Sequence, residues 1–166
     1  MIFHASMPAR NPQHVAQFIA QLWDGFAAPF PSFPDSWMAV AGDERGTIIE
    51  TYPHDRVITP GTSDESFAPG AAATPAQYSA FHMAIATRMS AEEVYALGEQ
   101  EGWRTIRCTR GDNFFDVIEV WVENTTMIEV LTSDMQVQYQ SFATPANFRA
   151  FAAAAAASAA TATHSA

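Results

Sequence analysis

Two short stretches, Phe81-His82-Met83-Ala84-Ile85 and Met127-Ile128-Glu129-Val130-Leu131, decide how this chain folds. Each is an apolar run typical of a β-strand, and each carries one ionisable side chain in its middle. Burying such a side chain costs free energy unless a partner satisfies it. The same arrangement occurs earlier in the chain, in Ile2-Phe3-His4-Ala5-Ser6 and Thr47-Ile48-Ile49-Glu50-Thr51. The sequence therefore contains two histidine–glutamate pairs in matching predicted strands.

A helix is predicted after the first strand of each half. Asn11, with proline next to it, is a typical N-cap, and Ser90 begins the capping box Ser-Ala-Glu-Glu. Apolar residues follow at helical spacing, namely Val15, Phe18, Ile19, Leu22 and Trp23 in the first half and Val94, Leu97 and Trp103 in the second. The two helix starts lie 79 residues apart, the two histidines 78 and the two glutamates 79. Helix, strands and polar residues thus repeat together, which predicts a duplicated module.

More strands follow each helix, and turn residues separate them. The predicted strands are 37–41 and 47–52 in the first half and 104–109, 116–123 and 126–132 in the second. The chain therefore predicts an α+β fold with two tandem βαβββ modules. We expect a first module over 1–55, a linker or functional loop over 56–78 because of its Pro, Gly, Ala, Ser and Thr content, a second module over 79–147, and a C-terminal helix or Ala-rich tail over 148–166.

Composition limits the possible functions. The formal charge is −10 and all eight basic residues are arginine, so we expect no binding to nucleic acid. No apolar run approaches the ~20 residues that span a bilayer, and we expect neither a membrane partner nor a signal peptide. The single cysteine, Cys108, indicates a reducing compartment, so we expect a cytoplasmic protein and interpret Cys108 as a small core residue.

The four polar strand residues are candidate metal ligands. Because side chains alternate along a strand, His4, Glu50, His82 and Glu129 lie opposite the apolar face that packs under the helices. Two imidazoles and two carboxylates suit Zn, Ni, Co, Mn or Fe, and would leave positions open for a substrate. The alternative interpretation for each residue alone is a hydrogen-bonded histidine or a water-facing glutamate. Their repetition at matched offsets favours a metal site.

Glu119 is a weaker candidate. It lies in Val117-Ile118-Glu119-Val120-Trp121, which alternates in the same way as the other strands. Two interpretations stay open for it: a second acid near the metal, or an exposed strand residue.

With these motifs, residues 2 to 132 resemble the vicinal oxygen chelate superfamily, of the glyoxalase I, bleomycin resistance and extradiol dioxygenase type. The resemblance implies a curved, mostly antiparallel sheet with the helices on its outer face. It maps His4, Glu50, His82 and Glu129 onto the metal ligands. It implies a lyase or isomerase that binds a small substrate through vicinal oxygens and abstracts the proton next to a metal-bound carbonyl. Glu129 is the expected base, with Glu50 as the alternative.

The resemblance leaves two other functions open. One is an Fe(II) extradiol-type dioxygenase that uses three of the four residues as a facial triad. The other is a non-catalytic, antibiotic-type protein that binds a small molecule without turnover. In this superfamily the two modules of one site come from one chain or from two subunits, and we expect a homodimer.

Overall fold

The structure is a computed structural model that describes residues 4–30, 33–44, 46–60, 67–71, 81–111, 113–144, 146–147 and 150. The first half contains β1 (His4–Ala9), α1 (Pro12–Trp23), β2 (Phe26–Pro29), β3 (Trp37–Val40) and β4 (Ile48–Pro53). The second half contains β7 (Met83–Ala86), α2 (Ala91–Glu101), β8 (Thr105–Arg110), β9 (Phe115–Val122) and β10 (Thr126–Leu131).

The two halves have the same topology. Each forms a four-stranded sheet, with strand order β1-β4-β3-β2 in the first and β7-β10-β9-β8 in the second. In each sheet the first and last strands of the module run parallel, and the other neighbours are antiparallel. This confirms the predicted α+β fold of two tandem βαβββ modules. The sequence did not predict β2 as a strand, because only four residues form it and one of them is proline.

Three elements lie outside these sheets. Strands β5 (Arg56–Pro60) and β6 (Phe67–Ala71) form an antiparallel pair within the predicted linker. The helix α3 (Ser133–Phe142), which the sequence did not predict, follows β10 directly. The predicted C-terminal helix or tail over 148–166 lies outside the described residues, apart from Ala150. Among the described residues, no helix combines the length and apolar character needed to cross a membrane.

The predicted helix ends are confirmed. The side chain of Asn11 accepts a hydrogen bond from the backbone N–H of His14 at 3.2 Å, which satisfies one free donor of the first turn of α1. Ser90 and Glu93 form both hydrogen bonds of a capping box at the start of α2. The helix ends at Gly102, which has a positive φ of 67° that glycine adopts without strain.

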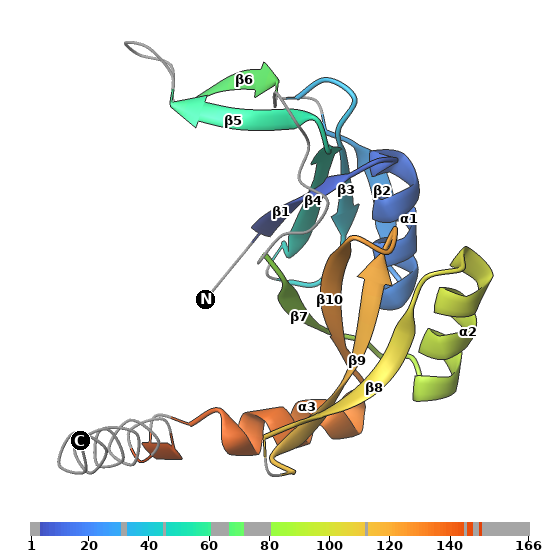
Figure 1. The fold of residues 1–166 in the computed structure, drawn as a ribbon, viewed down its shortest axis with the longest axis vertical. Coiled ribbons are helices and arrows are strands. Elements are labelled where there is room, and N and C mark those ends of the chain that lie inside the picture. The colour runs from blue at the N-terminus through green and yellow to red at the C-terminus, as the bar shows by residue number, and fades with distance from the viewer. Residues whose placement is uncertain are drawn as a thin grey trace, which may run out of the picture.

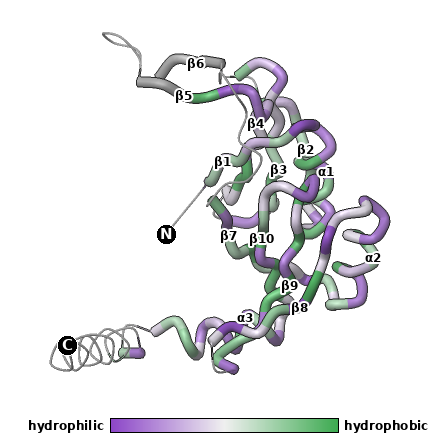
Figure 2. The backbone as a smooth tube through the Cα atoms, in the orientation of Figure 1, coloured by the Kyte–Doolittle hydropathy of each residue, from purple (hydrophilic) through white to green (hydrophobic). Residues whose placement is uncertain are grey.

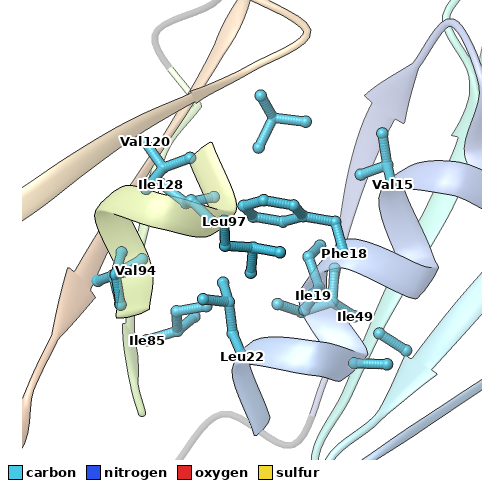
Figure 3. Packing of buried hydrophobic residues seen from close by; sticks show 14 of the residues in the cluster. Val15, Phe18, Ile19, Leu22, Ile49, Ile85, Val94, Leu97, Val120 and Ile128 are labelled. Carbon is cyan, nitrogen blue, oxygen red and sulfur yellow. The ribbon is translucent and has the colours of Figure 1, made fainter. Parts of the chain in front are cut away.

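The helices α1 and α2 lie on the same side of the two sheets and share one hydrophobic core (Figure 1). Apolar side chains from both helices and both sheets converge in it, including Phe18, Leu22, Ile49, Val94, Leu97 and Ile128 (Figure 3). The ring of Phe18 on α1 lies 4.7 Å from that of Trp103 in the second module. One core therefore joins the modules.

Polar contacts also cross the seam between the modules. The carboxylate of Glu123 accepts hydrogen bonds from the backbone N–H groups of Arg10 and Asn11, at 2.6 and 2.8 Å. The indole of Trp23 donates to the backbone oxygen of Ala86 at 3.1 Å. Glu123 thereby stabilises the positive N-terminal end of α1 from the second module. These contacts fix how the two sheets are placed.

The faces of the sheets opposite α1 and α2 form the open side of the molecule, apart from the start of β9, where Tyr139 of α3 packs against Phe115 with ring centroids 5.0 Å apart. Figure 1 shows α1 and α2 on one side, while the β5–β6 pair and α3 project beyond the sheets on the other. In β9 the residues of the helix-covered face, Ile118, Val120 and Val122, are buried, whereas Glu119 and Trp121 on the other face are only half-buried. Hydrophobic and hydrophilic residues both occur in β8 and β9 (Figure 2). The helix-covered face holds buried Val120, Ile128 and Val130.

Replacing Phe18 with Ala tests the shared core. Phe18 is 1% exposed, so the change leaves a cavity at the seam, and we expect a loss of about 3–5 kcal/mol in the free energy of unfolding, measured by urea denaturation. Phe26→Ala is the control, because Phe26 is 56% exposed and its removal leaves no cavity. A loss for Phe18→Ala as small as that of the control would contradict a core shared by the modules.

Candidate functional site

The strand registers place His4, Glu50 and Glu129 on the open faces, whereas His82, which was predicted to lie within a strand, directly precedes β7. In the first sheet Glu50 lies opposite Ser6, two residues after His4, so these three residues share a face. In the second sheet Glu129 lies opposite Ala84, two residues after His82. Both histidines are exposed, whereas Glu50 is buried and Glu129 is half-buried. Ser6 and Ala84 are equivalent positions of the repeat, and so are Glu50 and Glu129.

Glu50 is held by two hydroxyl groups. Its Oε2 accepts hydrogen bonds from Ser6 Oγ at 2.9 Å and from the Tyr52 hydroxyl at 2.7 Å. Glu50 and Tyr52 are each 9% exposed, so both hydrogen bonds are largely shielded from water. The Tyr52 ring packs edge-on against Phe33, with centroids 4.7 Å apart. Within the described part of the chain, neutral donors thus orient Glu50, and no cationic side chain pairs with it.

The environment of Tyr52 raises the pKa of its hydroxyl to about 12. Burial is the largest cause, followed by the hydrogen bond to Glu50 and by the charge of that carboxylate. The phenol therefore remains a neutral donor to Glu50 at any physiological pH.

Glu129 is held by an arginine instead. The guanidinium of Arg110, on β8, donates from Nε to Oε1 of Glu129 at 3.1 Å and from Nη2 to the same oxygen. Nη2 also donates to Oε1 of Glu119 at 2.8 Å. Glu119 lies directly opposite Glu129 in the register of β9 and β10. One guanidinium therefore binds two neighbouring carboxylates of the open face.

Glu119 has several further donors. Its Oε2 accepts from the indole Nε1 of Trp121 at 3.1 Å and from Arg104 at 3.4 Å. Burial would raise the pKa of Glu119, but hydrogen bonds led by the one from Arg110 outweigh burial, and the net shift is downward. The same two carboxylates, Glu129 foremost, raise the pKa of the Arg110 guanidinium. Arg110 and Glu119 thus each favour the charged form of the other.

The sequence singled out Glu119 but missed Arg110. Of the two interpretations of Glu119, an exposed strand residue is wrong, since only 12% of its side chain is exposed. Arg110 shares the face of Cys108, because the two are separated by one residue in β8. Burial, the largest cause, and neighbouring Glu119 raise the pKa of the Cys108 thiol, which leaves it unactivated. Only the pairing of β8 with β9 could have placed Arg110 near Glu119, and the sequence alone did not give the register of that pair.

The two modules thus treat equivalent glutamates differently. Where the first module has Ser6 and Tyr52, the second has Ala84 and Leu131, which carry no hydroxyl. Opposite Glu50 lies Met38, whereas Glu119 lies opposite Glu129. The first carboxylate is held by hydroxyl groups and the second by a cation.

The described residues bring no set of metal ligands together. Among the described residues, no three side chains of His, Cys, Asp or Glu lie close enough together to hold an ion. The Glu129 oxygen that faces Arg110 already binds a cation, and guanidinium and metal charges would repel each other at that oxygen. Convergence of His4, Glu50, His82 and Glu129 on one ion stays a prediction, as do the roles of Glu129 and Glu50 as base.

Two hollows adjoin the second sheet. One, of about 570 Å³, is lined by Arg104, Glu119, Trp121 and Asn124. The other, of about 560 Å³, lies at the seam between the modules, with Trp23, Asp43, Ala84 and Arg88 in its wall. Both volumes fall in the range of about 300–1,000 Å³ that is typical of small-molecule sites.

Comparisons with known proteins give structural similarity only. No protein-family model matches the chain, and no curated protein matches it. Similar solved structures include a protein of Agrobacterium tumefaciens (14% identity, 78% of this chain and 93% of that chain, TM-score 0.49). They also include the "glyoxalase/bleomycin resistance protein/dioxygenase" of Alicyclobacillus acidocaldarius (17% identity, 78% of this chain and 89% of that chain, TM-score 0.45). A third is the fosfomycin resistance protein FosX of Listeria monocytogenes (9% identity, 81% of this chain and 96% of that chain, TM-score 0.49).

The names of the last two belong to the superfamily that the sequence resembles. With identities of 17% or less and TM-scores below 0.5, these similarities carry no argument about what this chain does.

A Tyr52→Phe variant tests the hydroxyl contact with Glu50. The folded-state pKa of Tyr52, about 12, lies above the ordinary value of 10.0. The stabilisation from the neutral phenol is therefore complete below pH 10 and is lost as the pH rises toward 12. We expect the wild-type free energy of unfolding to fall over this window by on the order of 2 kcal/mol, since one pKa unit corresponds to about 1.4 kcal/mol.

Denaturation curves at a series of pH values measure this fall, and we expect Tyr52→Phe to remove most of it. Tyr95→Phe is the control, because the hydroxyl of Tyr95 donates to no carboxylate of the described residues. If the free energy of unfolding fell equally with pH in Tyr52→Phe and in the wild type, groups other than Tyr52 would be its cause.

Proposed function

We propose that this chain binds a small organic molecule on its open face and does so without a metal ion, the antibiotic-type binding function that the sequence left open. One observation carries the proposal: both carboxylates expected to bind a metal are engaged by donors of the chain itself. Ser6 and Tyr52 hold Glu50, and Arg110 holds Glu129. Donors that already hold a carboxylate lower its tendency to ligate a metal or to accept a proton from a substrate, because part of its charge and lone pairs is already satisfied.

The hollow beside Glu119 is the proposed binding place. Trp121 offers an aromatic wall, Asn124 an amide, and Arg104 and Glu119 opposite charges. Aromatic surface with a few polar groups at its edge is the common pattern of small-molecule sites. The open face also exposes Ile106, which is 41% accessible and shares the face of Glu119. We expect the ligand to be a partly aromatic molecule with both hydrogen-bond donors and acceptors.

A thermal-shift screen tests this binding. The probes are a library of small aromatic molecules together with bleomycin and fosfomycin, each measured with and without excess EDTA. We expect at least one probe to raise the melting temperature by the same amount in both conditions, because ligand binding to the folded state stabilises it. We expect Trp121→Ala to abolish that rise and Phe26→Ala, on an exposed residue elsewhere, to leave it unchanged. A rise that vanishes with EDTA would contradict metal-free binding.

The second candidate is a metal-dependent lyase or isomerase, favoured by the exposure of His4 and His82 at equivalent positions of the repeat. Since no three donors of the described chain come together, this candidate requires a homodimer in which a second copy completes the ligand set. His4 and Glu50 would come from one copy, and His82 and Glu129 from the other. The β5–β6 pair and α3 project beyond the open faces and are positioned to contact such a copy (Figure 1). A cytoplasmic location stays a prediction from the single cysteine.

Light scattering and metal analysis of the purified protein separate the two candidates. The second predicts a dimer that retains about one divalent ion per site, and a loss of that ion in His82→Ala. It also predicts weaker dimerisation in Val137→Asp, because Val137 on α3 is 64% exposed and would be covered by the second copy. A monomer without bound metal would contradict this candidate and leave the first unaffected.

A further inference from the structure

The contacts of Arg110 are those of a bound cation. Its guanidinium lies between Glu129 and Glu119, whose strands pair so that the two residues are directly opposite each other. The side chain of Arg110 is 31% exposed, and those of Glu129 and Glu119 are 13% and 12% exposed. The three charged groups are thus shielded from water on most of their surface, which strengthens their mutual attraction.

The two carboxylates depend on this cation. Side chains that lie directly opposite on neighbouring strands have Cβ atoms within about 5.5 Å, so two glutamates there repel each other. Arg110 offsets this repulsion by donating to Oε1 of both. A divalent metal ion would offset it in the same way, but the guanidinium charge at Oε1 of Glu129 would repel an ion bound to that carboxylate. Guanidinium and metal therefore compete for Glu129.

The first module supplies an internal comparison. Glu50 has no acidic residue opposite it, since Met38 occupies that position, and hydroxyl donors from Ser6 and Tyr52 are sufficient to hold it. Within the described residues, the glutamate with a carboxylate opposite it, Glu129, has a guanidinium partner, and Glu50 has hydroxyl partners. This matches a role in balancing the charge of the two carboxylates rather than a general requirement of the fold.

We infer that Arg110 is a built-in counter-cation that occupies Glu129 in place of a divalent metal ion, and that it lowers the affinity of the second module for such an ion. This inference goes beyond the proposed function, because it concerns the cation at Glu129 whether or not a small molecule binds. For Glu129 to ligate a metal, Arg110 would have to give up its contact with Glu129 and pair with Glu119 only. Glu119 can accept it, since it already shares the same Nη2.

Removal of Arg110 tests this inference. The full-length wild type and Arg110→Met are freed of metal and titrated with Zn²⁺ and with Mn²⁺ by calorimetry. We expect Arg110→Met to bind one Zn²⁺ at least ten-fold more tightly than the wild type, since the two carboxylates lose their cation. Arg107→Met is the matched control: it lies on the same strand but on the other face, paired with Asp116, and we expect it to behave as the wild type.

Two further variants keep the result interpretable. Adding Glu129→Gln to Arg110→Met is expected to return the Zn²⁺ affinity to the wild-type level. Arg110→Met could unfold because the two carboxylates then repel each other. In that case the double variant Arg110→Met with Glu119→Gln is titrated instead, because it lacks one of the two charges and keeps Glu129 available for the metal ion. Wild-type Zn²⁺ binding as tight as that of the Arg110 variant would overturn the inference. Tighter binding that survives Glu129→Gln would do so as well. The small-molecule thermal shift is measured separately, so either proposal can fail alone.

Discussion

The packing of α1 against the second module is the constraint on which the rest of the structure depends. Phe18 and Trp103 bring the two modules into one core, and Glu123 binds the first backbone N–H groups of that helix. A four-stranded sheet with one helix buries little apolar surface alone, so joining the modules enlarges the core that stabilises both. Because both helices lie in this core, both remaining sheet faces are left open on the same side.

The carboxylates of Glu50 and Glu129 on those open faces are stabilised in two different ways. Half-buried carboxylates are costly unless hydrogen bonds or opposite charges compensate them. At Glu50 two hydroxyl groups supply hydrogen bonds and no charge, and at Glu129 a guanidinium supplies both. The duplicated module therefore carries two chemically different halves: an oriented anion in the first and a balanced ion cluster in the second. This asymmetry is the main argument for small-molecule binding without a metal.

Much of the fold could be predicted from local sequence signals. Asn11 and Ser90 marked the helix starts because capping depends on residues within one turn. Apolar alternation located most strands to within a few residues. The strand β2 and the helix α3 were missed for opposite reasons. The first is a short edge strand ending in proline, and α3 has only one buried residue, Met135, so its sequence lacks an apolar stripe.

The sequence by itself determined the duplication, the helix caps and the sheet face on which Glu50 and Glu129 lie, because these follow from spacing and strand alternation. Only the tertiary structure decided what holds the glutamates. Arg110 and Glu129 are 19 residues apart and sit on strands that do not pair with each other, since β9 separates them. Their contact depends on the registers of two strand pairs at once, and a shift of one residue would place Arg110 on the other face. A local sequence pattern does not determine the registers of two strand pairs, so the contact between Arg110 and Glu129 could not be predicted from it.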